Sequence, residues 1–246
     1  MKADFTTIQV KRTVILNTRS IWLELDGNLD AESGQFVMAW LPGVGERPFS
    51  IASLEPLCLL VVDVGPFSHA MHQLKPGDRL WIKGPLGHGF SLLGETAILV
   101  GGGYGAAPLW SLAQAARSQA MNVCVCLGAR NQADLLLCEA FKEIGCELCL
   151  TTEDGSSGEQ SLVTEVVEKL LKSNTMDGLY ACGPTGMLTA LASLAKKYDV
   201  PYQLSWEALM RCGMGLCGSC EVPQTCDPAL PAGWLACFDG PVFRYP

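Results

Sequence analysis

The sequence has no long hydrophobic run: its apolar stretches, such as residues 57–62, are far shorter than the ~20 residues that cross a bilayer. The first residues show no apolar signal core either. Positive charge is scarce, because 17 Lys and Arg residues stand against 25 Asp and Glu residues, for a formal net charge of −8. Phosphate backbones are bound mainly through Lys and Arg. We therefore expect a chain with no membrane segment and no nucleic-acid partner.

Histidine is also rare, with three in 246 residues, and none of the three falls in a pattern that predicts a catalytic role. Cysteine, by contrast, is abundant, with twelve. Most of the cysteines before residue 205 lie inside apolar runs, where cysteine acts as a small hydrophobic residue. This distribution is typical of free thiols in a reducing compartment and not of a secreted disulfide scaffold. We expect a cytoplasmic protein.

Four cysteines near the C-terminus are spaced for metal binding. Cys212, Cys217 and Cys220 form a C-x4-C-x2-C pattern, and Cys237 follows, which is the plant-type [2Fe–2S] spacing. Glycines between them let the loop wrap closely and direct N–H groups at sulfur. Structural zinc is the alternative, although zinc ribbons usually have two C-x2-C knuckles. Cys226 is a second candidate for the fourth ligand, but it lies in a proline-rich stretch, so we favour Cys237.

Residues 1–94 are predicted to form a small antiparallel β-barrel. Short β-branched runs alternate there with turn residues. Turn signals at residues 26–27, 42–43 and 76–78 predict hairpins.

The remainder of the chain has a different pattern. Over residues 95–204, apolar strands alternate with helical segments, among them 106–120 and 133–144, which predicts a doubly wound parallel α/β sheet. Residues 205–246 contain the cysteine loop and are expected to form a small subdomain. The predicted fold class is therefore a multidomain α+β protein with a barrel, a parallel sheet and a cluster subdomain.

Ligands of doubly wound sheets bind beyond the carboxyl ends of the strands, and three loops there are distinctive. The first ends a predicted strand and opens a helix, so its small residues would let a pyrophosphate approach backbone N–H groups. It contains four glycines around Tyr104: Gly101, Gly102, Gly103 and Gly105. The second is Cys182-Gly183-Pro184, and the third, residues 151–155, carries acidic groups that could face a ribose hydroxyl. Plain turns and a solvated acidic loop remain the alternatives.

The barrel has one candidate site of its own, at the predicted head of a strand: Arg47, Pro48, Phe49 and Ser50. A guanidinium pairs well with phosphate, an aromatic ring covers a flavin, and a hydroxyl reaches a ring nitrogen. A turn with a surface arginine and a core phenylalanine is the simpler alternative.

Taken in order, these motifs resemble the ferredoxin-reductase-like iron–sulfur flavoproteins. Over its full length the chain is similar to the electron-transfer subunits of class 1B dihydroorotate dehydrogenases. The shared order includes the glycine-dense segment Gly84–Phe90, the four-cysteine loop and the closing segment Asp239–Phe243. The resemblance implies an FAD-binding barrel, an NAD(H)-binding sheet and a C-terminal [2Fe–2S] subdomain.

The resemblance also implies roles for individual residues. Arg47 would bind FAD phosphate, with Pro48 beside it, Phe49 would pack on the flavin, and Ser50 would lie near its redox-active nitrogen. A segment that departs from the usual Gly-Thr pair of the family would line the ribityl chain and ring edge: Val62, Asp63, Val64, Gly65, Phe67 and Ser68. The glycine loop and Cys182, Gly183 and Pro184 would hold NAD(H). Ser50 and Cys182 are thus the candidate catalytic residues.

The function implied is that of an NAD-linked oxidoreductase subunit. It would pass electrons between NAD(H), FAD, the [2Fe–2S] cluster and an FMN-containing dihydroorotate dehydrogenase catalytic subunit of pyrimidine biosynthesis, in a dimer of heterodimers. The alternative is a diaphorase subunit of a cytoplasmic hydrogenase or of a ferredoxin–NAD(P) reductase complex. The transhydrogenase type differs in having aspartate where Cys212 stands. A zinc-binding module without nucleotide is the non-enzymatic alternative, and it would be colourless.

Overall fold

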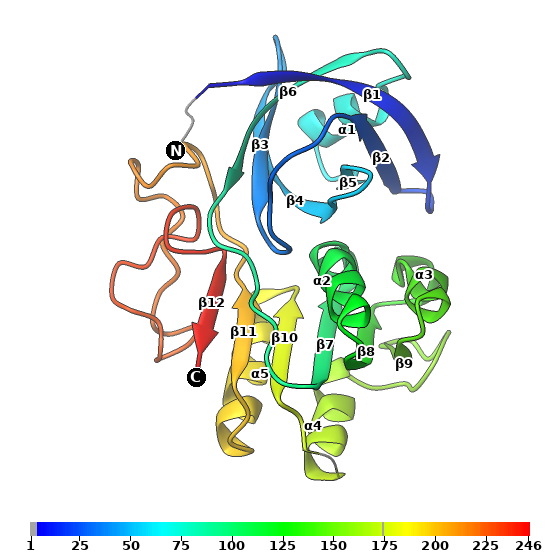
Figure 1. Ribbon diagram of the computed structural model, residues 1–246, viewed down its shortest axis with the longest axis vertical. Coiled ribbons are helices and arrows are strands. Elements are labelled where there is room, and N and C mark those ends of the chain that lie inside the picture. The colour runs from blue at the N-terminus through cyan, green and yellow to red at the C-terminus, as the bar shows by residue number, and fades with distance from the viewer. Residues whose placement is uncertain (1–3, 174) are drawn as a thin grey trace.

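The computed structural model describes residues 4–173 and 175–246. A β-barrel packs above an open sheet that is flanked by helices, and the C-terminal segment wraps along one side of both (Figure 1). Within these two ranges, no helix is long and apolar enough to cross a membrane.

The barrel consists of six antiparallel strands that close in the order β1-β2-β5-β4-β3-β6. Their bounds are β1 Thr6–Ile15, β2 Ser20–Asp26, β3 Phe36–Leu41, β4 Gly45–Ser53, β5 Cys58–Val62 and β6 Arg79–Leu86. Inward apolar side chains fill the barrel, among them Val10, Leu23, Val37, Ile51 and Leu59. The helix α1 (Pro66–His72) follows β5 and adds Phe67 and Met71 to this core. The predicted antiparallel barrel is confirmed.

Only one of the three predicted hairpins is present. The turn at residues 42–43 joins β3 to β4, which pair from Leu41↔Gly45 onward. The prediction is wrong at residues 26–27, because β2 pairs with β1 and β5 and the chain crosses to β3. It is also wrong at residues 76–78, where α1 leads into β6, which pairs with β1 and β3. Turn residues specify a local reversal, whereas the strand partner depends on how the barrel closes.

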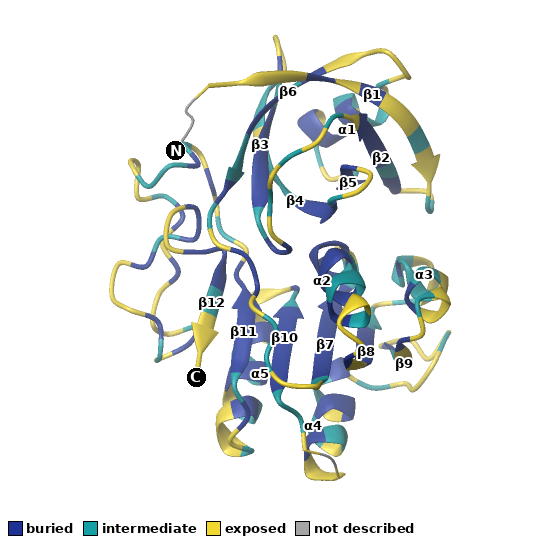
Figure 2. Cartoon of the chain, viewed as in Figure 1, coloured by how far each residue is buried: buried dark blue, intermediate teal, exposed yellow. Residues whose placement is uncertain are grey.

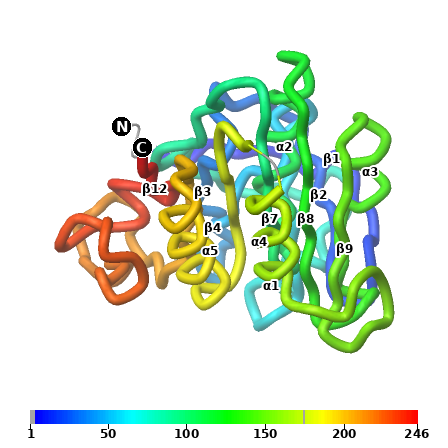
Figure 3. The backbone as a smooth tube through the Cα atoms, turned by 90° about the horizontal axis from the view of Figure 1, so that it is seen from below, coloured from blue at the N-terminus to red at the C-terminus, as the bar shows by residue number. Residues whose placement is uncertain are grey.

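The predicted parallel sheet is confirmed, with strand order β12-β11-β10-β7-β8-β9. Its parallel strands are β7 Thr96–Gly102, β8 Asn122–Ala129, β9 Glu147–Thr152, β10 Gly178–Cys182 and β11 Tyr202–Ser205. The helices are α2 Ala106–Ser118, α3 Cys138–Glu143, α4 Val163–Ser173 and α5 Thr185–Lys197. The helices α2 and α3 share one core with the sheet, and α4 and α5 share the other. Figure 3 shows α4 and α5 lying side by side.

The helix expected over residues 133–144 is shorter than predicted. Residues 132–134 form a separate 3₁₀ turn, in which the Asn131 side chain accepts a hydrogen bond from the Asp134 N–H at 3.2 Å. Leu137 then adopts a left-handed conformation with φ of 63°, so α3 begins only at Cys138. A left-handed residue cannot continue a right-handed helix, which explains the break.

The C-terminal segment returns to the sheet. The strand β12 (Val242–Tyr245) pairs antiparallel with β11, and the rings of Tyr202 and Tyr245 stack with centroids 4.9 Å apart. Asp227 is fully buried and accepts hydrogen bonds from Tyr202 Oη and Lys196 Nζ, each at 2.6 Å. Residues 205–246 are therefore tied to the α/β sheet at two separate points, which periodicity did not predict.

All twelve cysteines are free thiols. Figure 2 shows that β7, β10 and β11 are buried along their length, whereas β1 exposes much of its outer face. Three of the thiols, Cys124, Cys126 and Cys149, place their sulfur atoms within 4.8 Å of one another. They belong to the same core as Val166 and Val167 of α4, so they pack as small apolar side chains.

Candidate functional site

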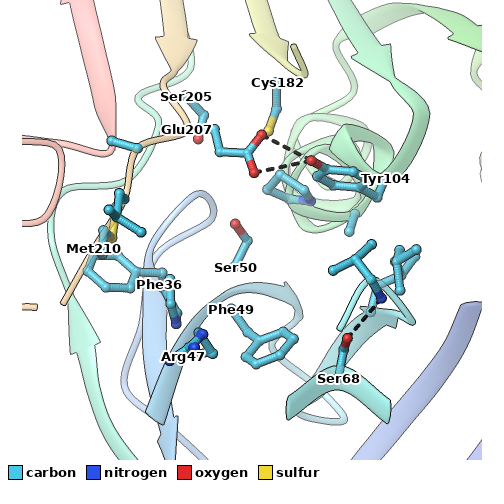
Figure 4. Close-up of a pocket in the computed structure, with 18 of the residues that line it drawn as sticks. Phe36, Arg47, Phe49, Ser50, Ser68, Tyr104, Cys182, Ser205, Glu207 and Met210 are labelled. Atoms are coloured by element: carbon cyan, nitrogen blue, oxygen red, sulfur yellow. Dashed lines mark hydrogen bonds between the residues drawn. The ribbon is translucent and has the colours of Figure 1, made fainter. Parts of the chain in front are cut away.

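A cleft of about 530 Å³ separates the barrel from the sheet. One wall comes from β4 and the β5–α1 connection, and the other comes from the glycine loop, the end of β10 and residues 205–210. Figure 4 shows Ser50 pointing into the cleft from the barrel side, with Cys182, Tyr104 and Glu207 across from it.

All four residues of the arginine motif line this cleft, but they lie within β4 and not at its head. Arg47 is exposed, and its Nη1 donates to the Glu46 carbonyl oxygen at 2.7 Å. The rings of Phe49 and Phe67 lie 6.0 Å apart and form an apolar wall. This combination of an exposed guanidinium and a flat apolar wall fits a ligand with a phosphate and a planar ring.

The segment after β5 contributes unequally to the cleft. Five of its six predicted residues line it: Val62, Val64, Gly65, Phe67 and Ser68. The sixth, Asp63, bonds to His69 Nδ1 at 3.0 Å, and this hydrogen bond lowers the pKa of the Asp63 carboxyl. The Ser68 hydroxyl accepts hydrogen bonds from the Val64 and Gly65 N–H groups, so this third residue of α1 reaches back to fix the backbone at the start of the helix. Asp63 therefore interacts with α1 at the surface, and Ser68 mainly fixes the loop.

The opposite wall carries the polar groups. Burial raises the pKa of the Cys182 thiol to about 12, so this thiol stays neutral and acts as a weak hydrogen-bond donor. Tyr104 Oη donates to the Glu207 carboxylate, at 3.0 Å from Oε2 and 3.1 Å from Oε1. Burial and the Glu207 charge raise the pKa of Tyr104 to about 12.

Sequence reasoning missed Glu207. It lies 103 positions from Tyr104 and belongs to no spacing motif. The available signal was its place just beyond β11, because the carboxyl ends of parallel strands face the ligand in such sheets.

A second cleft, of about 630 Å³, lies beyond the carboxyl ends of β7, β8 and β9. It is lined by Gly102, Gly103 and Pro184 from the predicted loops, and Val62, Val64 and Tyr104 line both clefts. Ligands in the two clefts would therefore meet beside Tyr104. Charged residues of both signs line this second cleft: Arg19, Arg130, Asp134 and Glu153.

The remaining glycines of the loop have a packing role. A Cβ atom on Gly105 would collide with the Cys182 carbonyl oxygen, and one on Gly101 would approach Leu127 Cδ2 to 2.9 Å. Neither residue lines either cleft. The start of α2 therefore lies directly against the turn after β10, which brings the glycine loop beside Gly183.

The four C-terminal cysteines form two contacting pairs, Cys212 with Cys217 and Cys220 with Cys237. Backbone N–H groups point at their sulfur atoms: Met214 N–H at Cys212 Sγ (3.5 Å) and Gly215 N–H at Cys237 Sγ (3.2 Å). Ser219 Oγ lies 3.0 Å from Cys217 Sγ and lowers the pKa of Cys217 to about 6. Two thiol pairs with N–H donors suit a binuclear iron–sulfur cluster.

Two further observations bear on the ligand set. Among the described residues, the metal-binding groups gathered within 4.8 Å of one another are Cys124, Cys126 and Cys149. Within the described ranges, no three of the four C-terminal sulfur atoms gather this closely. Cys226 lies in a separate turn, where its N–H donates to the Pro223 carbonyl oxygen at 2.9 Å.

Two protein-family models match this chain, one over the α/β sheet and one over the C-terminal segment. Residues 207–246 match the iron–sulfur cluster binding domain of dihydroorotate dehydrogenase B, and residues 99–193 match the oxidoreductase NAD-binding domain. A Thermococcus kodakarensis protein named probable dihydroorotate dehydrogenase B (NAD(+)), electron transfer subunit, is 41% identical over 217 residues, covering 88% of this chain and 86% of the relative. A Methanocaldococcus jannaschii protein of the same name is 37% identical over 220 residues, covering 89% and 81%.

A solved structure shows the same arrangement. It is that of the NADH-dependent reduced ferredoxin–NADP oxidoreductase, from a study of flavin-based electron bifurcation, and it is 30% identical to this chain. The TM-score is 0.83, and the match covers 99% of this chain and 90% of that one. The barrel, the sheet and the C-terminal segment are therefore similar as a unit to a flavin-dependent electron-transfer protein.

Proposed function

Because the chain belongs to the family of electron-transfer subunits of dihydroorotate dehydrogenase B, we propose that it passes electrons between NAD(H) and an FMN-containing catalytic subunit that oxidises dihydroorotate in pyrimidine biosynthesis. It is an NAD-linked flavin oxidoreductase subunit whose cofactors are FAD, a [2Fe–2S] cluster and NAD(H). One observation carries the proposal: residues 205–210 line the barrel cleft, and the chain then leads directly into Cys212. We also propose a cytoplasmic location, which twelve free thiols support.

We assign the flavin to the barrel cleft. Arg47 is placed to pair with FAD phosphate, Pro48 and Phe49 to pack against the ring system, and the segment from Val62 to Ser68 to line its edge. When bound, FAD exchanges a hydride with NAD(H) and the cluster carries single electrons. The hydroxyl of Ser50 and the neutral thiol of Cys182 face this cleft from its two walls, which supports their assignment as the groups beside the reacting atoms.

We assign the dinucleotide to the second cleft. Gly102 and Gly103 lead into the N-terminus of α2, where backbone N–H groups and the helix dipole favour a pyrophosphate. Gly183 lines the flavin cleft and Pro184 the second cleft, so the turn after β10 is placed where nicotinamide and flavin would meet. Tyr104 lines both clefts and is held by Glu207, so it is placed to position the nicotinamide.

Replacing Glu153 with arginine is expected to shift the cofactor preference from NADH toward NADPH. A carboxylate beyond β9 accepts a hydrogen bond from a ribose 2′-hydroxyl and repels a 2′-phosphate. Charged hydrogen bonds contribute ~1.5–3 kcal/mol, so the ratio of kcat/KM for NADH to that for NADPH should fall by at least about tenfold. Steady-state diaphorase assays with an artificial acceptor measure this ratio. Glu147→Arg, at the other end of β9, is the matched control. An unchanged ratio in Glu153→Arg would exclude the assignment.

We propose that the partner docks over the cysteine loop. Three apolar side chains on or beside the loop are exposed: Leu209, Leu216 and Phe238. Leu216 stands next to Cys217, and Phe238 next to Cys237, so apolar contact there would bring a partner cofactor close to the cluster. A dimer of heterodimers is the assembly we expect.

Co-purification of the tagged chain from its host tests the proposed function. We expect an FMN-containing partner and dihydroorotate-dependent NAD reduction by the complex.

Leu216→Gln should weaken the complex by about tenfold or more, as loss of a central interface anchor does, while keeping the cluster spectrum. Ile15→Gln on β1 is the control, because Ile15 is 77% exposed and Leu216 79%. Recovery of a ferredoxin-linked NADP-reducing partner would instead support the second candidate, which the match to the ferredoxin–NADP oxidoreductase structure favours.

A further inference from the structure

Lys83 on β6 is a buried cation beside the cysteine loop. Its side chain is only 6% exposed, and a buried ammonium is costly unless it is paired. Lys83 Nζ lies 3.1 Å from Glu46 Oε1 and donates to the carbonyl oxygen of Cys212 at 3.1 Å. The same ammonium lies 5.4 Å from the centre of the Phe5 ring. The Lys83 ammonium therefore interacts with three parts of the chain: the ring of Phe5 just before β1, the carboxylate of Glu46 on β4, and the backbone of Cys212.

The loop rests on the barrel at this point. Gly213 has a φ of 68°, and a Cβ atom there would come within 2.8 Å of Met38 Cγ and 3.3 Å of Leu86 Cδ1. These barrel side chains come from β3 and β6, the strands on which Lys83 and its neighbours lie. The backbone that leaves Cys212 is therefore packed against the barrel wall, with the Lys83 ammonium beside it.

Lys83 also belongs to a row of laterally paired residues on neighbouring strands that reaches the flavin cleft. Lys83 pairs with Met38 across β6 and β3, and Met38 pairs with Pro48 across β3 and β4. Glu46, the ionic partner of Lys83, directly precedes Arg47, which lines the cleft. Lys83 thus joins the wall of the flavin cleft to the cluster loop through one strand row and one ion pair.

We propose that Lys83 is a positioning residue that holds the cluster loop on the flavin barrel and, through its positive charge beside Cys212, raises the reduction potential of the cluster. This inference rests on the proposed function, since it concerns the cluster assigned there. Reduction adds one electron, and thus one negative charge, to the cluster. A fixed positive charge close by stabilises the reduced form, and the carboxylate of Glu46 partly offsets that effect.

Redox titration of the purified protein followed by electron paramagnetic resonance tests this proposal. In Lys83→Met, the ratio of reduced to oxidised cluster at a fixed potential should fall about tenfold, a negative shift of ~59 mV for one electron. Lys83→Arg keeps the positive charge, so the cluster in this variant should have the same reduction potential as in the wild type. Glu46→Gln removes the opposing charge and should shift the potential in the positive direction.

Lys196→Met is the matched structural control. Lys196 also anchors residues 205–246, through Asp227 at 2.6 Å, but its partner is not a cluster ligand. Its loss should lower the melting temperature and leave the cluster potential unchanged. If Lys83→Met binds iron normally and keeps the wild-type potential, the proposal is overturned. If that variant fails to assemble a cluster, Glu46→Gln decides, and an unshifted potential there overturns it. A wild-type protein without any cluster signal would instead contradict the proposed function.

Discussion

Replacing Cys237 with serine is expected to remove the visible cluster absorbance, whereas replacing Cys226 with serine is expected to leave it. Cys237 is buried, contacts Cys220 and lies 3.2 Å from the Gly215 N–H. Changes to residues around metal ligands alone cost about 10–100-fold, so loss of a ligand should reduce cluster-dependent electron transfer by at least ~100-fold. NADH-dependent reduction of an artificial acceptor should persist, because it requires only the two nucleotide clefts. Visible spectra, iron content and the two assays measure these outcomes.

Cys226→Ser controls for the loss of a thiol in the same segment. Cys226 is half-buried and lies in the turn that begins at Pro223. If instead the Cys226 variant loses the spectrum and the Cys237 variant keeps it, the ligand assignment is wrong. A colourless wild-type protein that contains zinc would contradict the iron–sulfur assignment itself.

Replacing Gly105 with alanine is expected to lower the melting temperature and to weaken binding of both nucleotides. The added methyl group would collide with the Cys182 carbonyl oxygen, so the start of α2 and the turn after β10 must separate. Overpacking of this kind costs ~1–3 kcal/mol, which corresponds to a fall of about 2–12 °C for a chain of this size. The separation would also move Gly183 and Tyr104, which line the clefts. Thermal unfolding and NADH titration measure the two effects.

Gly186→Ala is the matched control for the melting temperature alone, because Gly186 lines the second cleft. Gly186 lies in the first turn of α5, and a Cβ atom there meets no heavy atom within 4 Å. Alanine is the better helix former by up to ~1 kcal/mol, so this variant should be as stable as the wild type or slightly more stable. A Gly105→Ala protein that melts at the wild-type temperature would show that the two loops are not in tight contact.

Local patterns accounted for the two large architectural units and for the cysteine spacing. Short β-branched runs between turn residues predicted the barrel, and the alternation of strands and helices predicted the parallel sheet, because both patterns depend on residues close together in the chain. The pairing of strands was less predictable: the turns at residues 26–27 and 76–78 have hairpin-like composition but connect strands that are not neighbours. The late start of α3 depends on one left-handed residue, Leu137, which no propensity indicates.

Some residues of the candidate site were predictable from short sequence motifs, and others were not. The arginine motif, the glycine loop and the turn at Cys182 were visible as short motifs because each is continuous in sequence. Glu207 and Lys83 were not, since each acquires its role from a partner more than 100 positions away. Asp63 belongs to a predicted segment, yet its carboxylate bonds to His69 outside both clefts. A residue's position within a motif does not specify the direction of its side chain.

Three features follow from residues close together in the chain: the element types, the order of the motifs, and the spacing of Cys212, Cys217 and Cys220. The contacts between distant groups depend instead on the folded chain: Cys220 with Cys237, Tyr104 with Glu207, and Lys83 with the cysteine loop. Such contacts follow from the closure of the barrel and from the return of β12 to the sheet edge. Both are long-range events, selected by the burial of many side chains together and not by any single stretch of sequence.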